Sequence, residues 1–370
     1  MTPRRSRVVA LGYQGFGNVG DEAILGGIEE LLRDEAVDVT TIIGGPAPIA
    51  AFASARRIAS RRLVPTPRTL LALARADALL VTGGGLLHDH FPVVVPRYLA
   101  WTLAARVLRC RVVWVGVGIG PLRRGSSRRL AALALRLSHL VLVRDESSAA
   151  LAREIGGRVD GVIPDPALFL APPAWPASLA SPASAAAEEG LAVVVREPIS
   201  DPAAADRLVR VLADLLAEAA AAGRPASILT FAGARDRAIA IRIADAVGER
   251  GHPRPRIDEL APDHRAALDR LAQASLVVTV RLHGMILAAV AARPFVAVAY
   301  DPKVQGVAGE LDAADLVIPL ETLTAATLDA GIERAGDPAR RGRIAARVAA
   351  LRERRGGIGA EIGTALRGER

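Results

Sequence analysis

The single lysine of this chain is the first residue whose type suggests chemistry. Forty-seven residues are lysine or arginine, and only Lys303, which follows the apolar run Phe295–Ala299 and Pro302, is a lysine. Lysine carries a compact point charge, whereas arginine carries a planar fork of donors. A lone lysine is more often a solvated surface charge, but retention of only this one predicts contact with an anionic oxygen.

Two arginines and one histidine occupy similar positions, each after a short apolar run. Arg281 and His283 follow Leu276–Val280, and Arg144 follows Leu140–Val143. The carboxyl ends of parallel strands meet at one edge of a sheet, where ligands bind. We therefore expect Arg281 and Lys303, at two successive strand ends, to form an anion site, and Arg144 to lie at the corresponding edge in the first half of the chain. His283 would lie beside the anion site as a group able to give up a proton near neutral pH.

Three glycine-rich segments in the first half of the chain are expected to form turns at one edge of the sheet predicted there. They span residues 12–20, 83–85 and 116–120, each after an apolar run. Glycine lets backbone amides approach a ligand closely, and it is also common in turns that bind nothing. Three such turns on one edge favour a binding role, and the residues we assign to it are Gly17, Asn18, Gly84, Gly85 and Gly118.

Acids and imidazoles near these turns allow two further interpretations. Asp21 and Glu22 open the helix after the first turn, where acids usually stabilise the helix dipole, although Asp21 could also take a proton from a hydroxyl. His88, Asp89 and His90 suggest a metal site. Neighbouring loop residues point apart and no third ligand has suitable spacing, so we predict no metal.

The elements that must position these residues alternate between short apolar runs and amphipathic stretches. Strands are predicted in the first half, with helices between them, at 7–11, 39–43, 78–81, 112–117 and 140–143. In the second half, strands are predicted at 191–196, 227–231, 276–280 and 295–299, and helices at 202–222, 236–250, 263–274 and 284–292. This alternation is typical of βα units around a parallel sheet. The predicted fold is α/β, with two Rossmann-like, doubly wound domains and a cleft between them.

Domain boundaries follow from length and from one aperiodic segment. A chain of 370 residues suits two domains, and residues 176–189 lie in a stretch rich in proline, alanine and serine. We predict an N-terminal domain at 1–175, a linker at 176–189, and a C-terminal domain at 190–370 that includes the last helices.

Composition restricts the partners. The net charge of +8 and a pI near 10.8 favour acidic partners such as anionic lipids or phosphorylated small molecules. Aromatic residues make up 3%, so binding of nucleic acid through stacked bases is not expected. Cys110 is the only cysteine, which excludes an internal disulfide and fits a reducing cytoplasm. No apolar stretch is long enough to span a bilayer, so membrane contact would be peripheral.

Seven short segments, taken together and in order, resemble the polysaccharide pyruvyl transferases of the CsaB type. The resemblance covers roughly residues 5 to 310, and the combination is far more specific than any one motif. The segments are G-Y-Q-G-F-G-N-V-G-D-E-A-I-L (12–25), T-G-G-G-L-L-H-D (82–89), G-V-G-I-G-P (116–121), V-R-D-E-S-S (143–148), D-P-A-L (165–168), V-R-L-H-G-M-I (280–286) and A-Y-D-P-K-V (299–304).

The resemblance implies a fold like that of GT-B glycosyltransferases and a reaction with phosphoenolpyruvate. Its enolpyruvyl group would move to a sugar of a cell-wall polymer precursor, typically N-acetylmannosamine, to form a cyclic ketal with release of phosphate and without a cofactor. Arg144, Arg281 and Lys303 would bind the donor's carboxylate and phosphate. His283 would protonate C3 of the enol, and Asp21 is the candidate base in the acceptor-binding N-terminal domain. The acceptor's identity and lipid linkage stay open.

Two other functions fit parts of the sequence. A nucleotide-sugar glycosyltransferase would share the architecture and would need an acid for the donor ribose, for which Glu310 could serve, but it leaves Lys303 and Arg281 without a use. A non-catalytic scaffold would not need a sole lysine beside His283. Thermal protection by phosphoenolpyruvate or by a nucleotide sugar distinguishes these functions.

Overall fold

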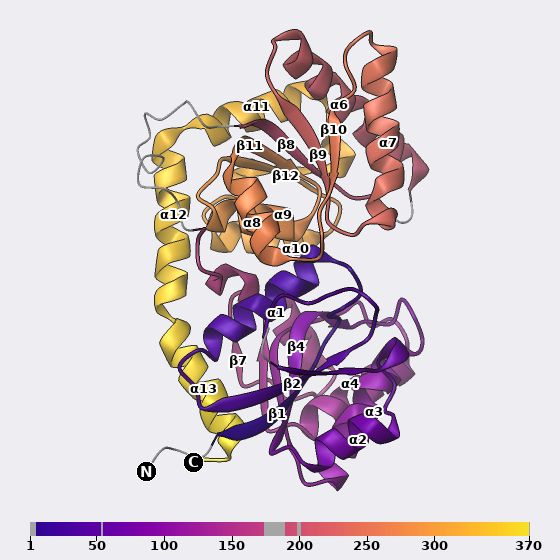
Figure 1. Ribbon diagram of the computed structural model, residues 1–370, viewed down its shortest axis with the longest axis vertical. Coiled ribbons are helices and arrows are strands. Elements are labelled where there is room, and N and C mark those ends of the chain that lie inside the picture. Colours follow the sequence, from indigo (N-terminus) through magenta and orange to yellow (C-terminus); the bar gives the residue numbers. More distant parts are fainter. Residues whose placement is uncertain (1–4, 53–54, 174–188, 198–200, 370) are drawn as a thin grey trace. The chain divides into compact units, whose positions relative to one another are not determined.

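The computed structural model describes residues 5–52, 55–173, 189–197 and 201–369. They form two α/β units, each with its own parallel sheet and helices on both faces (Figure 1). Unit 1 comprises 1–17, 21–170 and 351–370, and unit 2 comprises 18–20 and 171–350. The predicted pair of doubly wound α/β domains is confirmed.

Unit 1 contains a seven-stranded parallel sheet in the order β3-β2-β1-β4-β5-β6-β7. Its central strands are apolar along most of their length because both faces are covered. The strand order reverses between β1 and β4, which is where open sheets of this kind bind ligands. The strands are β1 (Ser6–Leu11), β2 (Val37–Ile43), β3 (Arg56–Ala59), β4 (Ala78–Leu87), β5 (Arg111–Ile119), β6 (Leu140–Val143) and β7 (Gly161–Val162).

The helices of unit 1 cover the two faces of this sheet unequally. One face packs against α2 (Pro67–Ala74), α3 (Val94–Val107), α4 (Gly125–Arg136) and α5 (Glu146–Glu154), around Trp101 and Trp114. The other packs against α1 (Val19–Leu31) and α13 (Arg355–Arg367), around Ile28 and Ile362. Figure 1 shows α2, α3 and α4 on one side of the strands and α1 and α13 on the other. Short 3₁₀ turns occur at Arg61–Leu63 and Pro166–Phe169.

Unit 2 contains a six-stranded parallel sheet in the order β10-β9-β8-β11-β12-β13. The strands are β8 (Glu189–Val195), β9 (Ala226–Thr230), β10 (Arg256–Glu259), β11 (Ala274–Thr279), β12 (Phe295–Ala299) and β13 (Val317–Pro319). The helices are α6 (Pro202–Ala221), α7 (Ala234–Glu249), α8 (His264–Ala272), α9 (Leu282–Val290), α10 (Pro302–Glu310), α11 (Ala325–Gly336) and α12 (Pro338–Glu353). In the part of the chain that the structure describes, no helix has the length and apolar character needed to cross a bilayer.

Two of the three predicted glycine turns are wrong, because the strands continue through them. Residues 83–85 lie within β4, and Gly116 and Gly118 lie within β5. The pairing of both strands is irregular here, and Gly84 and Gly116 have φ values of +107° and +66°. Glycine therefore accommodates bulges inside the sheet at these points, where a side chain would be strained.

The C-terminal end also differs from the predicted domain boundary. Residues 351–370 belong to unit 1, where α13 packs under the sheet through Ile358, Ile362 and Leu366. Nη1 of Arg355 donates to the carbonyl of Glu30 at 2.9 Å. The prediction assigned everything from 190 to 370 to the second domain. The predicted linker, 176–189, falls outside the described residues except for its last position.

Candidate functional site

Unit 2 contains a pocket of about 400 Å³ at the carboxyl ends of β8 and β9 and beside the residue that follows β11. Three of its seven lining residues are arginines, and two are acids. We call it the arginine pocket, and its lining consists of Asn18, Arg196, Glu197, Ala232, Arg235, Asp236 and Arg281. Asn18 and Arg281 were predicted as binding residues from the sequence, and the structure brings them to one pocket.

A buried carboxylate fixes Arg281 at the pocket wall. Asp236 is 1% exposed, and its Oδ2 accepts the backbone N–H groups of Phe231 (3.1 Å) and Ala232 (2.9 Å). Its Oδ1 accepts from Nη2 of Arg281 at 2.5 Å. Nε of Arg281 donates to the carbonyl of Val195 at 3.2 Å. Because these bonds leave little rotational freedom, the guanidinium is held in a fixed orientation between the end of β8 and the first turn of α7.

Arg196 is a pocket residue that sequence reasoning missed. Its guanidinium carbon lies 4.3 Å from the ring centroid of Tyr300, which is within cation–π range. Burial, followed by the charge of Arg281, lowers the pKa of Arg196 to about 10. The side chain stays protonated at neutral pH but is crowded by a like charge, which an anion between the two would relieve. The sequence feature that could have revealed Arg196 was its position immediately after the strand β8. Arg144 follows β6, and Arg281 lies near the end of β11, in the same way.

Lys303 lies beside this cluster in the first turn of α10. Its Nζ is 2.9 Å from Oδ2 of Asp301 and 5.9 Å from the ring centroid of Tyr300. The other oxygen of Asp301 caps the helix by accepting the N–H of Lys303 at 3.0 Å. Tyr300 is thus contacted by Arg196 and approached by Lys303, so the sole lysine lies next to the pocket arginines without lining the pocket itself.

His283 is the second residue of α9, whose N-cap residue is Arg281. The half-buried ring packs against Gly20: a Cβ at position 20 would come within 2.4 Å of Nδ1 of His283. Next to Gly20, the N–H of Val19 donates to the carbonyl of Phe231 at 2.9 Å. The segment 18–20 therefore supplies Asn18 to the arginine pocket and Gly20 to the surroundings of His283.

Arg144, the third predicted cation, lies in unit 1 and is 6% exposed. Its Nε is 3.3 Å from Asp145 and its Nη1 is 3.6 Å from Asp165. Gly118 lies against the guanidinium, since a Cβ there would be 2.7 Å from Nη2. Two carboxylates already neutralise this arginine, which supports a structural role more directly than an anion site.

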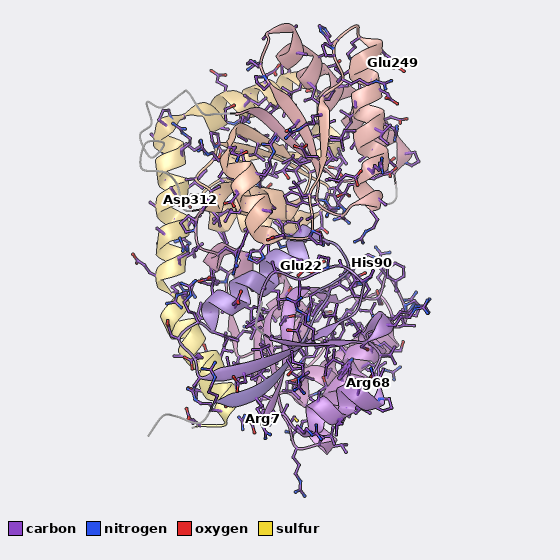
Figure 2. All side chains as sticks on the ribbon, in the orientation of Figure 1. Arg7, Glu22, Arg68, His90, Glu249 and Asp312 are labelled. Carbon is purple, nitrogen blue, oxygen red and sulfur yellow. The ribbon has the colours of Figure 1, made fainter. Side chains whose placement is uncertain are left out.

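Asp21 and the remaining predicted glycines also lie in unit 1. Asp21 is half-buried, and a Cβ on Gly84 would be 3.4 Å from its Oδ1. Gly85 is exposed, with nothing within 4 Å of a Cβ built on it, and Gly17 has φ of +76°. The neighbouring Glu22, labelled in Figure 2, is fully buried and accepts the N–H of Gly15 at 2.7 Å. Glu22 therefore holds the first glycine turn.

The segment 88–90 shows a structural use for its central acid. Oδ2 of Asp89 accepts the backbone N–H groups of Arg123 and Arg124, both at 2.7 Å. Burial alone would raise the pKa of Asp89, but these two hydrogen bonds, together with the charge of Arg124 and a hydrogen bond from Ser127, lower the pKa below its usual value. Within the described ranges no three His, Cys, Asp or Glu side chains are arranged to hold a metal ion.

Comparison with known families identifies the chain. The family described as polysaccharide pyruvyl transferase matches residues 18–302, which is most of the sequence and includes the arginine pocket and His283. The chain belongs to the polysaccharide pyruvyl transferase family. It is therefore a transferase enzyme, and the resemblance noted in the sequence is confirmed at the level of the family. A comparison of the transferase with curated proteins gives no match.

Solved structures similar to this transferase share its two-unit architecture. HepE from Anabaena, solved in complex with UDP and glucose, has a TM-score of 0.62 at 16% identity, covering 97% of this chain and 98% of HepE. UDP-GlcNAc 2-epimerase from Methanocaldococcus jannaschii has a TM-score of 0.58 at 13% identity, covering 90% and 93%. MnaA from S. aureus, solved with UDP, has a TM-score of 0.58 at 12% identity, covering 92% and 91%. These similarities establish a GT-B-like fold for the transferase.

Proposed function

We propose that this enzyme transfers the enolpyruvyl group of phosphoenolpyruvate to a sugar of a cell-wall polysaccharide precursor and forms a cyclic pyruvate ketal. The main support for the proposal is the arginine pocket, which lies in a chain that belongs to the polysaccharide pyruvyl transferase family. Arg196, Arg235 and Arg281 surround a space of about 400 Å³, which suits a small molecule.

The charges of the pocket match those of the donor. Phosphoenolpyruvate carries a carboxylate and a phosphate, and both groups are bound well by the planar, two-pronged donors of arginine. Asp236 compensates Arg281 and Glu197 adds one more negative charge, so three guanidinium groups and two carboxylates leave the lining with a net positive charge. In this proposal Lys303, next to Tyr300, contacts one phosphate or carboxylate oxygen at the edge of the pocket.

The reaction requires one proton to be delivered and two to be removed. His283 protonates C3 of the enol while a sugar hydroxyl adds to C2 and loses its proton to a base, for which Asp21 is our candidate. The resulting tetrahedral intermediate expels phosphate. A second hydroxyl of the same sugar then attacks C2 and loses its proton, which closes the ketal ring. No oxidation or cofactor is needed.

The finer assignment follows the CsaB-type motifs of the sequence. We propose N-acetylmannosamine in a secondary cell-wall polymer precursor as the acceptor, with a role in anchoring surface-layer proteins. We place the reaction in the cytoplasm, where the free, buried thiol of Cys110 remains reduced.

The test is phosphate release from phosphoenolpyruvate in the presence of N-acetylmannosamine glycosides, N-acetylglucosamine glycosides and glucose. We expect phosphate release with the first acceptor, and a new methyl singlet of the ketal in the proton NMR spectrum of the product. Hydrolysis of UDP-glucose, or glucosyl transfer from it, with no phosphate released from phosphoenolpyruvate would contradict the proposal and favour a glycosyltransferase.

A further inference from the structure

Positive charge is concentrated in one part of the chain. Residues 44–144 contain sixteen arginines and only two acids, Asp77 and Asp89, which gives this stretch a formal charge of +14. Since the whole chain carries +8, the remaining residues carry −6. The basic stretch forms β3 to β6 of unit 1 and the helices α2, α3 and α4 on one face of its sheet.

Two of these three neighbouring helices, α2 and α4, share one pattern on their outward sides. On α2, Arg68, Leu71 and Arg75 are exposed at helical spacing, and on α4 the same pattern recurs as Arg129, Leu133 and Arg136. Between them, α3 exposes an apolar stripe. It begins at Val93, just before the helix, and continues with Pro96, Ala100, Leu103 and Val107. Contacts of α3 with both α2 and α4 place the three stripes side by side. We call these residues the basic face.

The apolar side chains of the basic face are unusually exposed for a folded protein. Val107 is 80% exposed, Val93 59%, Leu71 51% and Leu103 42%. Single exposed apolar residues are ordinary, but several on adjacent helices, interleaved with arginines, indicate a contact surface. Helices of this composition lie in the interface of a bilayer, with the apolar residues at the acyl boundary and the basic residues at the headgroups.

Acidic residues do not neutralise this surface. Within the described part of the chain, no carboxylate lies within ion-pair distance of the four arginines of the basic face, Arg68, Arg75, Arg129 and Arg136. The same holds for three other arginines of the basic stretch, Arg61, Arg62 and Arg109. The same excess acts on His139, at the end of α4, whose pKa falls to about 4 through burial and then through Arg111 and Arg106. An anionic partner would thus meet uncompensated charge at the arginines of the basic face.

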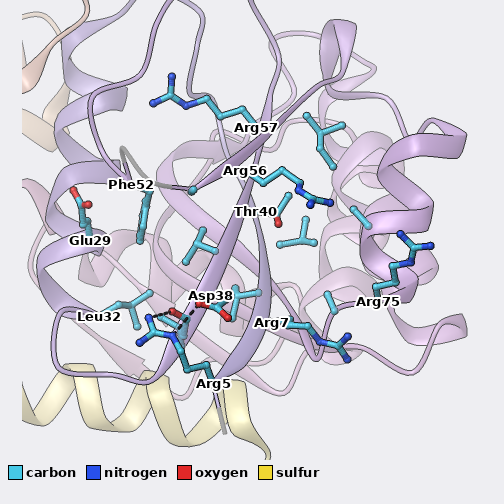
Figure 3. Close-up of a pocket in the computed structure, with 18 of the residues that line it drawn as sticks. Arg5, Arg7, Glu29, Leu32, Asp38, Thr40, Phe52, Arg56, Arg57 and Arg75 are labelled. Carbon is cyan, nitrogen blue, oxygen red and sulfur yellow. Dashed lines mark hydrogen bonds and ion pairs between the residues drawn. The ribbon is translucent and has the colours of Figure 1, made fainter.

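A basic recess lies beside α2. A pocket of about 880 Å³ lies along the edge strand β3 and its neighbour β2, and Arg56, Arg68 and Arg75 contribute to its wall. Figure 3 shows Arg56 and Arg75 on the same side of β2 as Thr40, with their guanidinium groups on the α2 side of the strand. Such a recess, next to exposed Leu71, can hold the phosphate of a headgroup while the helices rest on the surface.

We propose that the basic face is a docking surface for an anionic phospholipid bilayer. Charge complementarity selects this occupant: a second copy of the chain in a twofold-symmetric dimer would bring two such surfaces of equal sign together, which repel each other. Single-stranded nucleic acid is bound through bases stacked on aromatic side chains as well as through charge, whereas the exposed stripe of α3 is aliphatic, with Phe91, 65% exposed, just before it. The proposal does not depend on which sugar or donor the enzyme uses.

Co-sedimentation of the full chain with vesicles tests the proposal. The probes are phosphatidylcholine vesicles with about 30% phosphatidylglycerol, and pure phosphatidylcholine vesicles, at about 0.05 and 0.5 M NaCl. We expect binding only to the anionic vesicles, weakened at least about tenfold by salt. Reversal of two charges, Arg68→Glu with Arg75→Glu, should weaken the partition at least about tenfold at low salt. Leu103→Ser with Val107→Ser should weaken it several-fold at both salt concentrations.

The matched control reverses two exposed arginines of unit 2, Arg224→Glu with Arg343→Glu, which changes the net charge equally. This control should keep nearly the full partition, and circular dichroism should show that all variants are folded. Equal loss in the control and the α2 variant would mean that net charge, and not this face, drives binding. Absence of binding to anionic vesicles, or binding to single-stranded RNA alone, would also overturn the proposal.

Discussion

The imidazole of His283 lies so close to the Cα of Gly20 that a Cβ at position 20 would come within 2.4 Å of Nδ1. The two residues open two different helices, α9 and α1, and both are fixed by neighbouring backbone contacts. His283 follows the N-cap residue Arg281, whereas Gly20 follows Val19, which is bonded to Phe231. The orientation of the proposed proton donor therefore depends on the absence of a side chain at residue 20.

Gly20→Ala tests this relationship directly. The added methyl must displace the ring of His283, and a displacement of about 1 Å in a catalytic group can cost a hundredfold in rate. We expect kcat to fall at least tenfold, with the affinity for phosphoenolpyruvate unchanged. Gly342→Ala is the control, because this exposed glycine of α12 has open space around its Cβ position. Equal activity of the two variants would show that the ring position is irrelevant.

His283→Gln separates binding from proton transfer. Glutamine keeps a hydrogen-bonding group of similar reach but cannot act as an acid, so turnover should fall by about a hundredfold or more. Calorimetry should still show binding of phosphoenolpyruvate. If the variant forms ketal at the normal rate, and solvent deuterium still enters the methyl group, the proton comes from another source.

Arg196→Lys tests the arginine that the sequence did not reveal. Lysine keeps the charge but loses the fork and the stacking on Tyr300, and a charge-assisted contact contributes about 1.5 to 3 kcal/mol. The affinity for phosphoenolpyruvate should therefore fall by about ten- to a hundredfold in calorimetry. Arg254→Lys, at an exposed position paired with Asp245, should have no effect. Full affinity in Arg196→Lys would remove this residue from the donor site.

The buried His264 and the half-buried His139 predict how stability depends on pH. Burial lowers the pKa of His264 to about 4 from 6.5, so the unfolded chain binds a proton between these values that the folded chain does not. Stability is thus complete above about pH 6.5 and falls as the pH drops toward 4, by up to about 3 kcal/mol. His139 acts in the same direction.

Thermal melts at neutral and acidic pH check this dependence. The melting temperature of His264→Gln should fall less on acidification than that of the wild type, because the variant lacks the histidine that takes up a proton on unfolding. His252→Gln, at a half-buried site of the same unit, serves as the control. A wild-type melting temperature that is constant between pH 7 and pH 4.5 would contradict the expected proton uptake.

The sequence predicted the parts of the fold that depend on hydrophobic period. The strands Leu140–Val143 and Phe295–Ala299 were predicted at their observed bounds. The edge strands Arg56–Ala59 and Arg256–Glu259 were not predicted, because they are short and charged. Their strand conformation depends on backbone pairing with β2 and β9, which the composition of a single segment does not reveal. Periodicity also cannot say which unit α13 covers, since its apolar side would suit either sheet.

The candidate site was predictable only one residue at a time. Arg281 and Asn18 were named from their positions after apolar runs, and both line the arginine pocket. Asp236 was not, because an acid in the first turn of a helix is ordinary; its role depends on a bond to an arginine 45 residues away. Arg144 has the same strand-end position as Arg281, yet two carboxylates surround it in unit 1.

The central claim is that the arginine pocket binds phosphoenolpyruvate, and calorimetric titration of the wild type and Arg281→Ala tests it most directly. We predict that phosphoenolpyruvate binds to the wild type, that Arg281→Ala binds it at least about tenfold more weakly, and that UDP-glucose does not bind to either. Binding of UDP-glucose to the wild type, with no heat from phosphoenolpyruvate at millimolar concentration, would contradict the claim.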